Sequence, residues 1–352
     1  MPEIFHYSQS FTLESGYELQ GYHLAYTTHG VLNQQKDNVV WVFHALTANS
    51  DPAEWWPGII GEGKLFDPAL YFIICVNMPG SCYGSIGPMD LDPLLDDPYY
   101  YDFPAFTPRD MVRSYRPLKD SLGIVKIHAG IGGSMGGQQL LEWAIEEPEL
   151  FKYIFPIATN AQHSPWGIAF NASQRFCIEM DPSWKDQNSL AGIEGMKVAR
   201  SVALLSYRNY QTYHLGQSEK DNEKINNFKS ESYQRYQGEK LSNRFNAFSY
   251  HILSRSMDAH NIGRGRGSVT NALKMIKAKT LVIGITTDLL FPLSEQQYLS
   301  AEISGAKFQA IHSNYGHDGF LLESEQIEKL VLAFLIQKFI QTPAFPDDST
   351  NF

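Results

Sequence analysis

Apolar residues gather in short continuous runs in the first part of the chain. Four runs rich in β-branched and aromatic residues predict strands, at residues 39–44, 71–77, 125–131 and 153–157. Runs without polar alternation are typical of parallel strands buried on both faces. Residues 135–147 instead carry apolar side chains at helical spacing. This alternation predicts a mostly parallel sheet with helices on both faces, an α/β fold.

The pattern changes between about residue 164 and residue 270, where the sequence is polar with helical periodicity. Segments 188–227 and 228–258 predict helices joined by polar turns. We therefore predict a core domain of residues 1–163 and 271–352, interrupted by a helical lid domain of residues 164–270. The lid should cover the carboxyl ends of the strands, where such sheets bind ligands.

The strand and helix pattern returns after the lid. Strands are predicted at 280–285 and 308–312, and an amphipathic helix at 323–340. Its apolar stripe consists of Ile327, Leu330, Val331, Phe334 and Leu335. The last dozen residues are rich in Pro and Asp and predict a loose tail.

A glycine-rich turn joins the strand at 125–131 to the following helix. Its sequence Gly-Gly-Ser-Met-Gly, residues 132–136, matches the Gly-x-Ser-x-Gly elbow, which presents a serine nucleophile between strand and helix. Side chains two residues either side of the serine would collide, so glycine is favoured there. An ordinary serine in a Gly-rich turn is the alternative, but the flanking strand and helix favour Ser134 as nucleophile. Met135 stands where a dinucleotide-binding motif needs its third glycine.

Two later segments supply a candidate acid and base. Asp288 follows the strand at 280–285, and His317 lies between glycines directly before the final helix. In α/β hydrolases the triad follows the order Ser, Asp or Glu, then His. His317 would take the proton of Ser134 and return it to the leaving group, while Asp288 would fix the imidazole tautomer.

Each of these assignments has an alternative. Asp288 could instead form a turn or cap a helix. His312, at a strand end, is the nearest rival base, and His44 is assigned a structural role beside an early loop. The oxyanion hole needs two backbone N–H groups, and we assign them to Met135 and to Leu46 in the loop after the first strand.

The net charge indicates which partners the protein can bind, and the cysteine content indicates the redox state of its compartment. Lys and Arg total 28 against 38 Asp and Glu, a net charge of −10, so no nucleic-acid partner is expected. A Gly-Arg-Gly-Arg-Gly segment at residues 263–267 is interpreted as a lid turn. Three cysteines, Cys75, Cys82 and Cys177, form no disulfide framework and indicate a reducing compartment.

Targeting and metal signals are missing from the sequence. The N-terminus does not have the pattern of a signal peptide, and no apolar run approaches the about 18 residues of a membrane span. We expect a cytoplasmic protein that binds no membrane. No cluster of metal-ligating residues appears, so no metal is expected.

Taken together, these motifs resemble those of the homoserine O-acetyltransferase family, acyltransferases of methionine biosynthesis with the α/β-hydrolase fold. The resemblance covers the chain from about residue 15 to residue 340. The matching segments are 44–47 in the oxyanion loop, the Gly-rich loop 80–88, the elbow 132–137, the lid segment 233–245, the acid segment 288–292 and the base segment 316–320. The chain departs from the family pattern at Ala48, Ser81 and Tyr115.

The resemblance implies a ping-pong reaction, in which an acyl-CoA acylates Ser134 and an amino-acid hydroxyl then takes the acyl group. It also implies that Arg200, Tyr207 and Asp318 contact the amino acid. Residues seven apart share a helix face, as Arg200 and Tyr207 do. Arg200 is suited to grip a carboxylate bidentately and Asp318 to hold an ammonium group.

The expected function is transfer of an acetyl group from acetyl-CoA, a substrate rather than a bound cofactor, to L-homoserine. Acetyl is favoured over succinyl because no cation can be placed near residues 44–49. Serine O-acetyltransferase, homoserine O-succinyltransferase, and an esterase or thioesterase are alternatives; a binding protein with an inactive triad is another. Arg200 with Asp318 favours an amino-acid acceptor over water. The resemblance also implies a homodimer formed through the lid helices.

Overall fold

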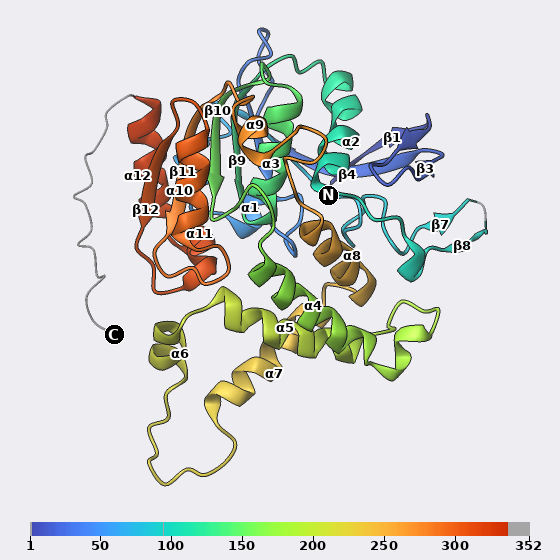
Figure 1. Cartoon of the computed structure of the whole chain (residues 1–352), viewed down its shortest axis with the longest axis vertical. Coiled ribbons are helices and arrows are strands. Elements are labelled where there is room, and N and C mark those ends of the chain that lie inside the picture. Colours follow the sequence, from blue (N-terminus) through green and yellow to red (C-terminus); the bar gives the residue numbers. More distant parts are fainter. Residues whose placement is uncertain (1, 94, 337–352) are drawn as a thin grey trace.

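The computed structural model describes residues 2–93 and 95–336 and contains one large twisted sheet (Figure 1). In the described residues this sheet has eight strands in the order β1-β4-β6-β5-β9-β10-β11-β12. Pairing is antiparallel between β1 and β4 and between β4 and β6, and parallel from β6 to β12. The strands are β1 Glu3–Tyr7, β4 Tyr22–His29, β5 Val39–Phe43, β6 Phe72–Val76, β9 Ile127–Gly133, β10 Phe151–Ile157, β11 Lys279–Ile285 and β12 Lys307–Ile311.

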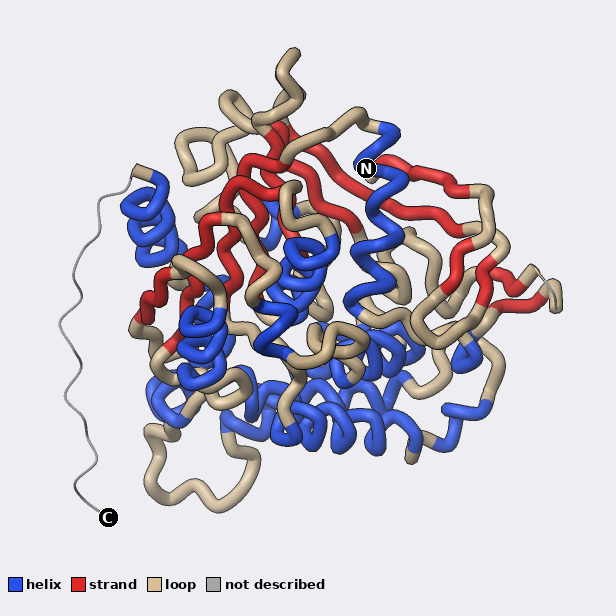
Figure 2. Tube along the Cα trace, turned by 45° about the horizontal axis from the view of Figure 1, so that its top comes forward, coloured by secondary structure: helices blue, strands red, loops and turns tan. Residues whose placement is uncertain are grey.

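Helices cover both faces of the sheet, as Figure 2 shows in the tilted view. The helices of this core are α1 Pro52–Trp55, α2 Pro108–Ser121, α3 Met135–Glu146, α9 Val269–Leu273, α10 Leu293–Glu302, α11 Gly319–Leu322 and α12 Ser324–Leu335. The mostly parallel sheet with helices on both faces confirms the predicted fold class.

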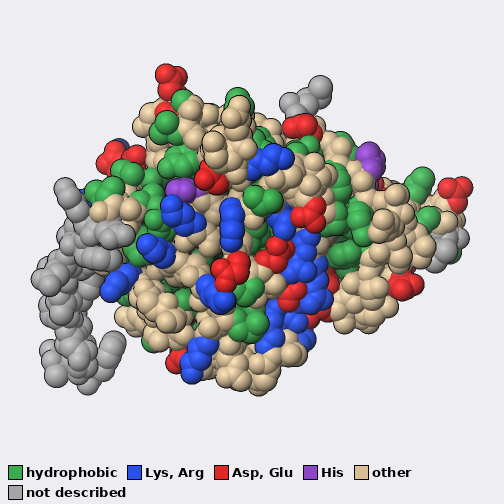
Figure 3. Space-filling model, turned by 90° about the horizontal axis from the view of Figure 1, so that it is seen from above, with side chains coloured by type: hydrophobic (Ala, Val, Ile, Leu, Met, Phe, Trp, Pro, Cys, Tyr) green, Lys and Arg blue, Asp and Glu red, His purple; other side chains and the backbone are tan. Residues whose placement is uncertain are grey.

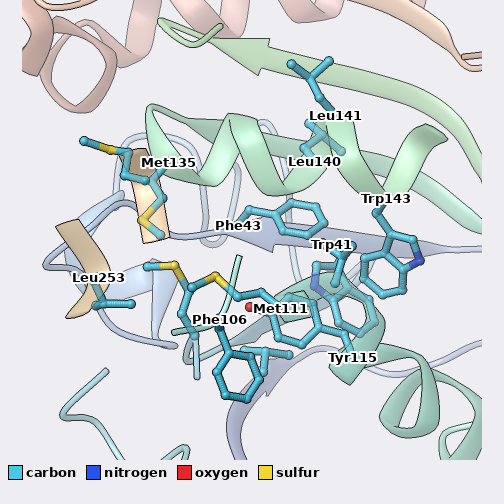
Figure 4. Packing of buried hydrophobic residues seen from close by; sticks show 14 of the residues in the cluster. Trp41, Phe43, Phe106, Met111, Tyr115, Met135, Leu140, Leu141, Trp143 and Leu253 are labelled. Atoms are coloured by element: carbon cyan, nitrogen blue, oxygen red, sulfur yellow. The ribbon is translucent and has the colours of Figure 1, made fainter. Parts of the chain in front are cut away.

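Strand side chains alternate between two hydrophobic clusters, one on each face of the sheet. Trp41 and Phe43 of β5 lie in the cluster that contains α2 and α3, whereas Val40 and Val42 lie in the opposite cluster. The ring centroids of Trp41 and Trp143 lie 4.7 Å apart in an edge-on arrangement (Figure 4). Because both faces are buried, β5 reads in sequence as a continuous apolar run.

The predicted strands occur with small shifts at their ends. The strand predicted at 125–131 begins instead at Ile127, because Val125 is 67% exposed and lies outside the sheet. The edge strand β1 and its neighbour β4 were missed. Residues of β1 alternate between exposed and half-buried positions, and β4 carries His and Thr, so neither forms a long apolar run.

A group of helices lies together beyond one end of the parallel strands, at the bottom of Figure 1. They are α4 Pro165–Glu179, α5 Ile193–Tyr207, α6 Tyr210–Gln217, α7 Lys229–Ser242 and α8 Ala247–Asp258. Helix α5 packs against α4 and α7, and α4 packs against α8. We call this group the lid. The sequence did not predict α4 as a separate helix. The division of the chain at residues 164 and 270 stays a prediction.

The Gly-Arg segment at 263–267 forms a turn, as predicted, and its arginines pair with the core, while its assignment to the lid stays a prediction. Arg266 pairs with Glu142 at 2.8 Å and with Glu146 at 2.6 Å, both on α3. Arg264 pairs with Glu14 at 3.1 Å. Figure 3 shows basic and acidic side chains intermixed on the face opposite the lid. The two arginines are therefore engaged in ion pairs within the protein.

The final amphipathic helix is α12, which buries Ile327 and Val331 against the sheet. The predicted helix at 323–340 extends past Ile336, and its remainder, like the predicted tail, lies outside the described residues. Among the helices of the described segments, none combines the length and apolar character needed to cross a membrane.

Candidate active site

The turn from β9 to α3 holds Ser134 in a conformation that L-residues rarely adopt. Ser134 has φ of 56° and ψ of −127°. A Cβ added to Gly132 would lie 2.7 Å from the carbonyl carbon of Gly136, and one added to Gly136 would lie 2.1 Å from the carbonyl oxygen of Phe43. Both glycines are therefore required by close backbone approach, as the elbow pattern predicts.

Neighbouring strands fix this strained residue. The backbone N–H of Ser134 donates to the carbonyl of Ile157 at 3.0 Å, and Thr159 Oγ1 donates to the Ser134 carbonyl at 2.8 Å. Ser134 is 6% exposed. The sheet thus holds the serine at the carboxyl end of β9 with little freedom to relax.

Asp288 and His317 form a buried pair. Asp288 Oδ2 lies 2.7 Å from His317 Nδ1, and Asp288 Oδ1 accepts from the backbone N–H groups of Leu290 and Phe291, each at 2.8 Å. Burial would lower the pKa of His317, but the charge and hydrogen bond of Asp288 outweigh it and raise the pKa above 6.5. The Phe291 ring stacks on the imidazole at 5.0 Å between centroids. The hydrogen bond from Nδ1 leaves Nε2 as the proton acceptor.

Ser134 and His317 line one cavity of about 540 Å³, together with residues of the lid. Ser134 follows β9, whereas His317 follows β12, so folding brings together residues that are far apart in sequence. Asp288 lies behind His317, on the side of Nδ1. We call this cavity the active-site pocket. The rival His312 lies elsewhere, with its Nδ1 3.2 Å from Thr286 Oγ1.

The two predicted oxyanion donors lie beside this pocket. Met135 is the first residue of α3, so its N–H has no acceptor within the helix. Leu46 lines the pocket within a turn closed by the Ala48 N–H, which donates to the Ala45 carbonyl at 3.0 Å. In residues 2–93 and 95–336, no hydrogen-bond acceptor faces the Leu46 N–H.

His44 supports the loop that carries Leu46. Its Nδ1 donates to the Ala45 carbonyl at 2.9 Å, and its Nε2 accepts from the Met78 N–H at 3.0 Å. Burial lowers the pKa of His44 to about 4, although the contact with Ala45 acts in the opposite direction. The ring is therefore neutral near pH 7 and has a fixed tautomer.

The three predicted substrate contacts also line the pocket. The Arg200 guanidinium carbon lies 5.4 Å from the centre of the Tyr207 ring, and that ring lies 5.8 Å from the His317 ring. Asp318 has a partner that the sequence did not indicate, since its Oδ2 lies 3.0 Å from Arg208 Nη1. Arg200 has no ion-pair partner among the described residues, so its charge is available to a ligand.

Sequence reasoning missed several polar residues that line the pocket. They are Glu54, Tyr83, Arg208, Gln237, Lys240 and Arg244. Gln237, Lys240 and Arg244 lie in segment 233–245, which resembles the family but did not indicate a role for any of these side chains. Arg244 also contradicts the expectation that no cation lies near residues 44–49, because its Nη1 lies 2.5 Å from the Thr47 carbonyl.

Of the three departures from the family pattern, one lines the active-site pocket and two are buried elsewhere in the protein. Ala48 lines the pocket. Ser81 is buried, and Tyr115 donates to Gln139 Oε1 at 2.7 Å in the core beneath α3. Within the described segments, no three His, Cys, Asp or Glu side chains are arranged to hold a metal ion.

Comparison with known proteins places the chain in a family. The α/β-hydrolase fold family matches residues 38–324. A homoserine O-acetyltransferase of Cyclobacterium marinum is 48% identical over 335 residues, which cover 95% of this chain and 95% of that protein. This chain belongs to the homoserine O-acetyltransferase family. The predicted resemblance is therefore confirmed.

Solved structures agree with this assignment to the homoserine O-acetyltransferase family. The homoserine O-acetyltransferase of Bacillus anthracis superposes with a TM-score of 0.87 at 26% identity, covering 95% of this chain and 97% of that one. An acetylester hydrolase of Corynebacterium glutamicum gives 0.83 at 25% identity, covering 95% and 96%. The same scaffold thus occurs in proteins named for transfer and for hydrolysis.

Proposed function

We propose that this protein transfers an acetyl group from acetyl-CoA to the hydroxyl of L-homoserine, through an acetyl-enzyme on Ser134. The observation that carries the proposal is the active-site pocket. It holds Ser134 together with His317, whose Nδ1 is paired with Asp288, and with Arg200, a cation without an ion-pair partner in the described chain. The family relationship supports the choice of acceptor.

In the first half-reaction, His317 Nε2 accepts the proton of the Ser134 hydroxyl while Oγ attacks the thioester carbonyl. The tetrahedral oxyanion accepts hydrogen bonds from the N–H groups of Leu46 and Met135. Collapse of this intermediate breaks the C–S bond, and the CoA thiolate leaves with the proton from His317. Asp288 stabilises the imidazolium that forms between these steps.

In the second half-reaction, the homoserine hydroxyl gives its proton to His317 and attacks the acetyl carbonyl. The ester bond to Ser134 breaks, and His317 returns the proton to Ser134 Oγ. Arg200 binds the carboxylate of the amino acid, with Tyr207 beside it, and Asp318 binds the ammonium group. Since Arg208 already pairs with Asp318, the ammonium shares that carboxylate with the arginine.

The preference for acetyl over succinyl now rests on the names of the relatives, because Arg244 places a cation beside the oxyanion loop. Hydrolysis is the second candidate, since a structural relative is named as an acetylester hydrolase. The decisive assay measures CoA release from acetyl-CoA and from succinyl-CoA, each with homoserine, serine or water. Fastest turnover with acetyl-CoA and homoserine supports the proposal, and turnover independent of any amino acid would contradict it.

The covalent step is tested by the intact mass of the protein after mixing with acetyl-CoA. The parent should gain one acetyl group, and Ser134→Ala should gain none while keeping its fold. An adduct that survives this substitution would exclude Ser134 as the nucleophile.

Acceptor binding is tested with Arg200→Ala. The CoA burst of about one per site should remain, while kcat/KM for homoserine falls about 30- to 1000-fold, or roughly 2–4 kcal/mol, for loss of one charge-assisted contact. Arg235→Ala is the matched control, since that side chain is 78% exposed on α7 and pairs only with Glu231 among the described residues. Loss of the burst would assign Arg200 to the donor or to the fold.

We also propose that the protein forms a homodimer through the lid and resides in the cytoplasm. Large apolar side chains are exposed on α4 and α5, including Phe176, Val198 and Leu205, with Met180 just after α4. Exposed apolar surface of this kind is typical of an interface. All three cysteines are free, which suits a reducing compartment.

A further inference from the structure

Three segments that resemble the family, 44–47, 80–88 and 233–245, meet at one side chain, Arg244. It follows α7 in the lid, and its Nη1 donates to the Thr47 carbonyl and to the Tyr83 hydroxyl, each at 2.5 Å. Thr47 belongs to the oxyanion loop and Tyr83 to the Gly-rich loop 80–88. All three residues line the active-site pocket.

The contact with Thr47 acts on the Thr47–Ala48 peptide. The N–H of this peptide closes the turn by donating to the Ala45 carbonyl, which belongs to the same peptide as the Leu46 N–H. Leu46 and Thr47 are the central residues of the turn between Ala45 and Ala48. Fixing the Thr47 carbonyl restrains rotation of this turn, and so restrains the direction of the Leu46 N–H. His44 holds the other end of the turn at the Ala45 carbonyl.

The remaining partners of Arg244 are themselves anchored. The Tyr83 carbonyl accepts from Asn77 Nδ2 at 2.7 Å, and the Tyr83 ring packs edge-on against Phe245 with centroids 5.7 Å apart. Cys82 Sγ lies 3.6 Å from the Arg244 carbonyl. Arg244 pairs with no carboxylate in the described chain, so its donors serve a backbone carbonyl and a phenol rather than a neutralising charge.

We propose that Arg244 is a positioning residue that aims the Leu46 N–H at the acyl oxygen and so couples the lid to acylation of Ser134. This inference rests on the proposed roles of Ser134 and Leu46. It predicts that Arg244 acts on the transition state of every acyl donor, whether or not the donor carries phosphate groups.

The first test compares acetyl-CoA with p-nitrophenyl acetate, which has no phosphates, in Arg244→Gln and Arg244→Lys. Loss of an oxyanion donor costs about 100- to 1000-fold, and a misdirected donor should cost less, about 10- to 100-fold. We expect kcat/KM to fall by the same factor for both donors, mainly through kcat. Arg235→Gln should change neither. A loss confined to acetyl-CoA would overturn the inference and assign Arg244 to the CoA phosphates.

The second test uses phenylboronic acid, which forms a tetrahedral adduct with a serine and places an oxygen in the oxyanion hole. Its inhibition constant should rise in Arg244→Gln by about the factor lost in kcat, with the melting temperature little changed. Lost activity with an unchanged inhibition constant would overturn the positioning role. A parent enzyme that shows neither inhibition nor an acetyl adduct would instead refute the proposed function, and the inference with it.

Tyr83→Phe provides a milder test of the same contact. It removes the hydroxyl that accepts from Arg244 but leaves the ring packed against Phe245. We expect a smaller loss of kcat than in Arg244→Gln and a double variant no worse than Arg244→Gln alone. Additive losses would show that Tyr83 and Arg244 act independently, which contradicts a shared positioning role.

Discussion

His317 must be neutral to accept the proton of Ser134, so its pKa sets the acidic limb of the pH–rate profile. Burial alone would lower that pKa, but Asp288 raises it above 6.5. We predict that kcat/KM for acetyl-CoA falls as the pH drops through a value above 6.5. In Asp288→Asn the limb should move to lower pH, and the plateau rate should fall about 10³- to 10⁴-fold. Rates of CoA release between about pH 5 and pH 9 measure both effects.

Glu295 is a second carboxyl near Asp288 and His317, so the pH–rate measurement needs a control for its titration. Burial, together with the charge of Asp288, raises the pKa of Glu295 to about 7. Glu295→Gln should leave the acidic limb in place, because the limb belongs to His317. If the limb disappears with Glu295, the assignment to His317 is wrong.

Glu295 also predicts how stability depends on pH. Its folded pKa of about 7 lies above its ordinary 4.5, so the folded state binds more protons between these values and stability falls as the pH rises through them. Its Oε2 is buried and has no hydrogen-bond partner in the described residues. Glu295→Gln should therefore gain roughly 1–2 kcal/mol more at pH 8 than at pH 5, discounted for partial exposure. Urea midpoints at the two pH values measure this, and an equal effect at both would contradict it.

At the scale of elements, the elbow depends on the close approach of α3 to β5. A Cβ at Gly136 would lie 2.1 Å from the Phe43 carbonyl oxygen, a backbone atom that cannot turn away. Gly136→Ala should destabilise the protein by about 2–3 kcal/mol and displace Ser134, with a loss of acylation. The control is Gly216→Ala on α6, where a Cβ meets nothing within 4 Å. Equal urea midpoints in the two variants would contradict the prediction.

Elements with both faces buried were the ones that the sequence predicted well. Strands β5 and β6 are continuous apolar runs because neither face meets water. Helix α4 was missed because its apolar residues do not form one stripe, and Trp166 and Phe176 are exposed on it. Its outward apolar surface obscures the period on which the prediction of amphipathic helices depends.

The catalytic residues could be predicted because the triad has a characteristic order along the chain. Residues whose role depends on tertiary contacts could not be predicted. Asp288 and His317 were found from their places after late strands. Arg208 and Arg244 were not assigned, because one pairs with Asp318 and the other binds the Thr47 carbonyl across the fold. No spacing in the sequence specifies such contacts.

At the scale of the whole molecule, lid and core are tied together on two sides. The Gly-Arg segment that follows the lid pairs with Glu14 and with Glu142 and Glu146 of the core. On the pocket side, Arg244 joins the lid to Thr47 and Tyr83. The lid is thus held at both places, and its inner face forms part of the wall of the active-site pocket.

The outer face of the lid gives the last prediction. Met180 is 81% exposed and Phe176 and Val198 are more than half exposed, and these three residues line one surface pocket. Burying them against a second copy removes apolar surface from water. Met180→Asp would bury an unpaired charge in that interface, so it should shift a dimer to monomer at micromolar concentration. Sedimentation equilibrium measures the shift. The control is Val31→Asp, because Val31 is 80% exposed and lies in the α/β domain, outside the lid. A parent that sediments as a monomer would refute the dimer, whereas a dimer that survives Met180→Asp would move the interface away from this face.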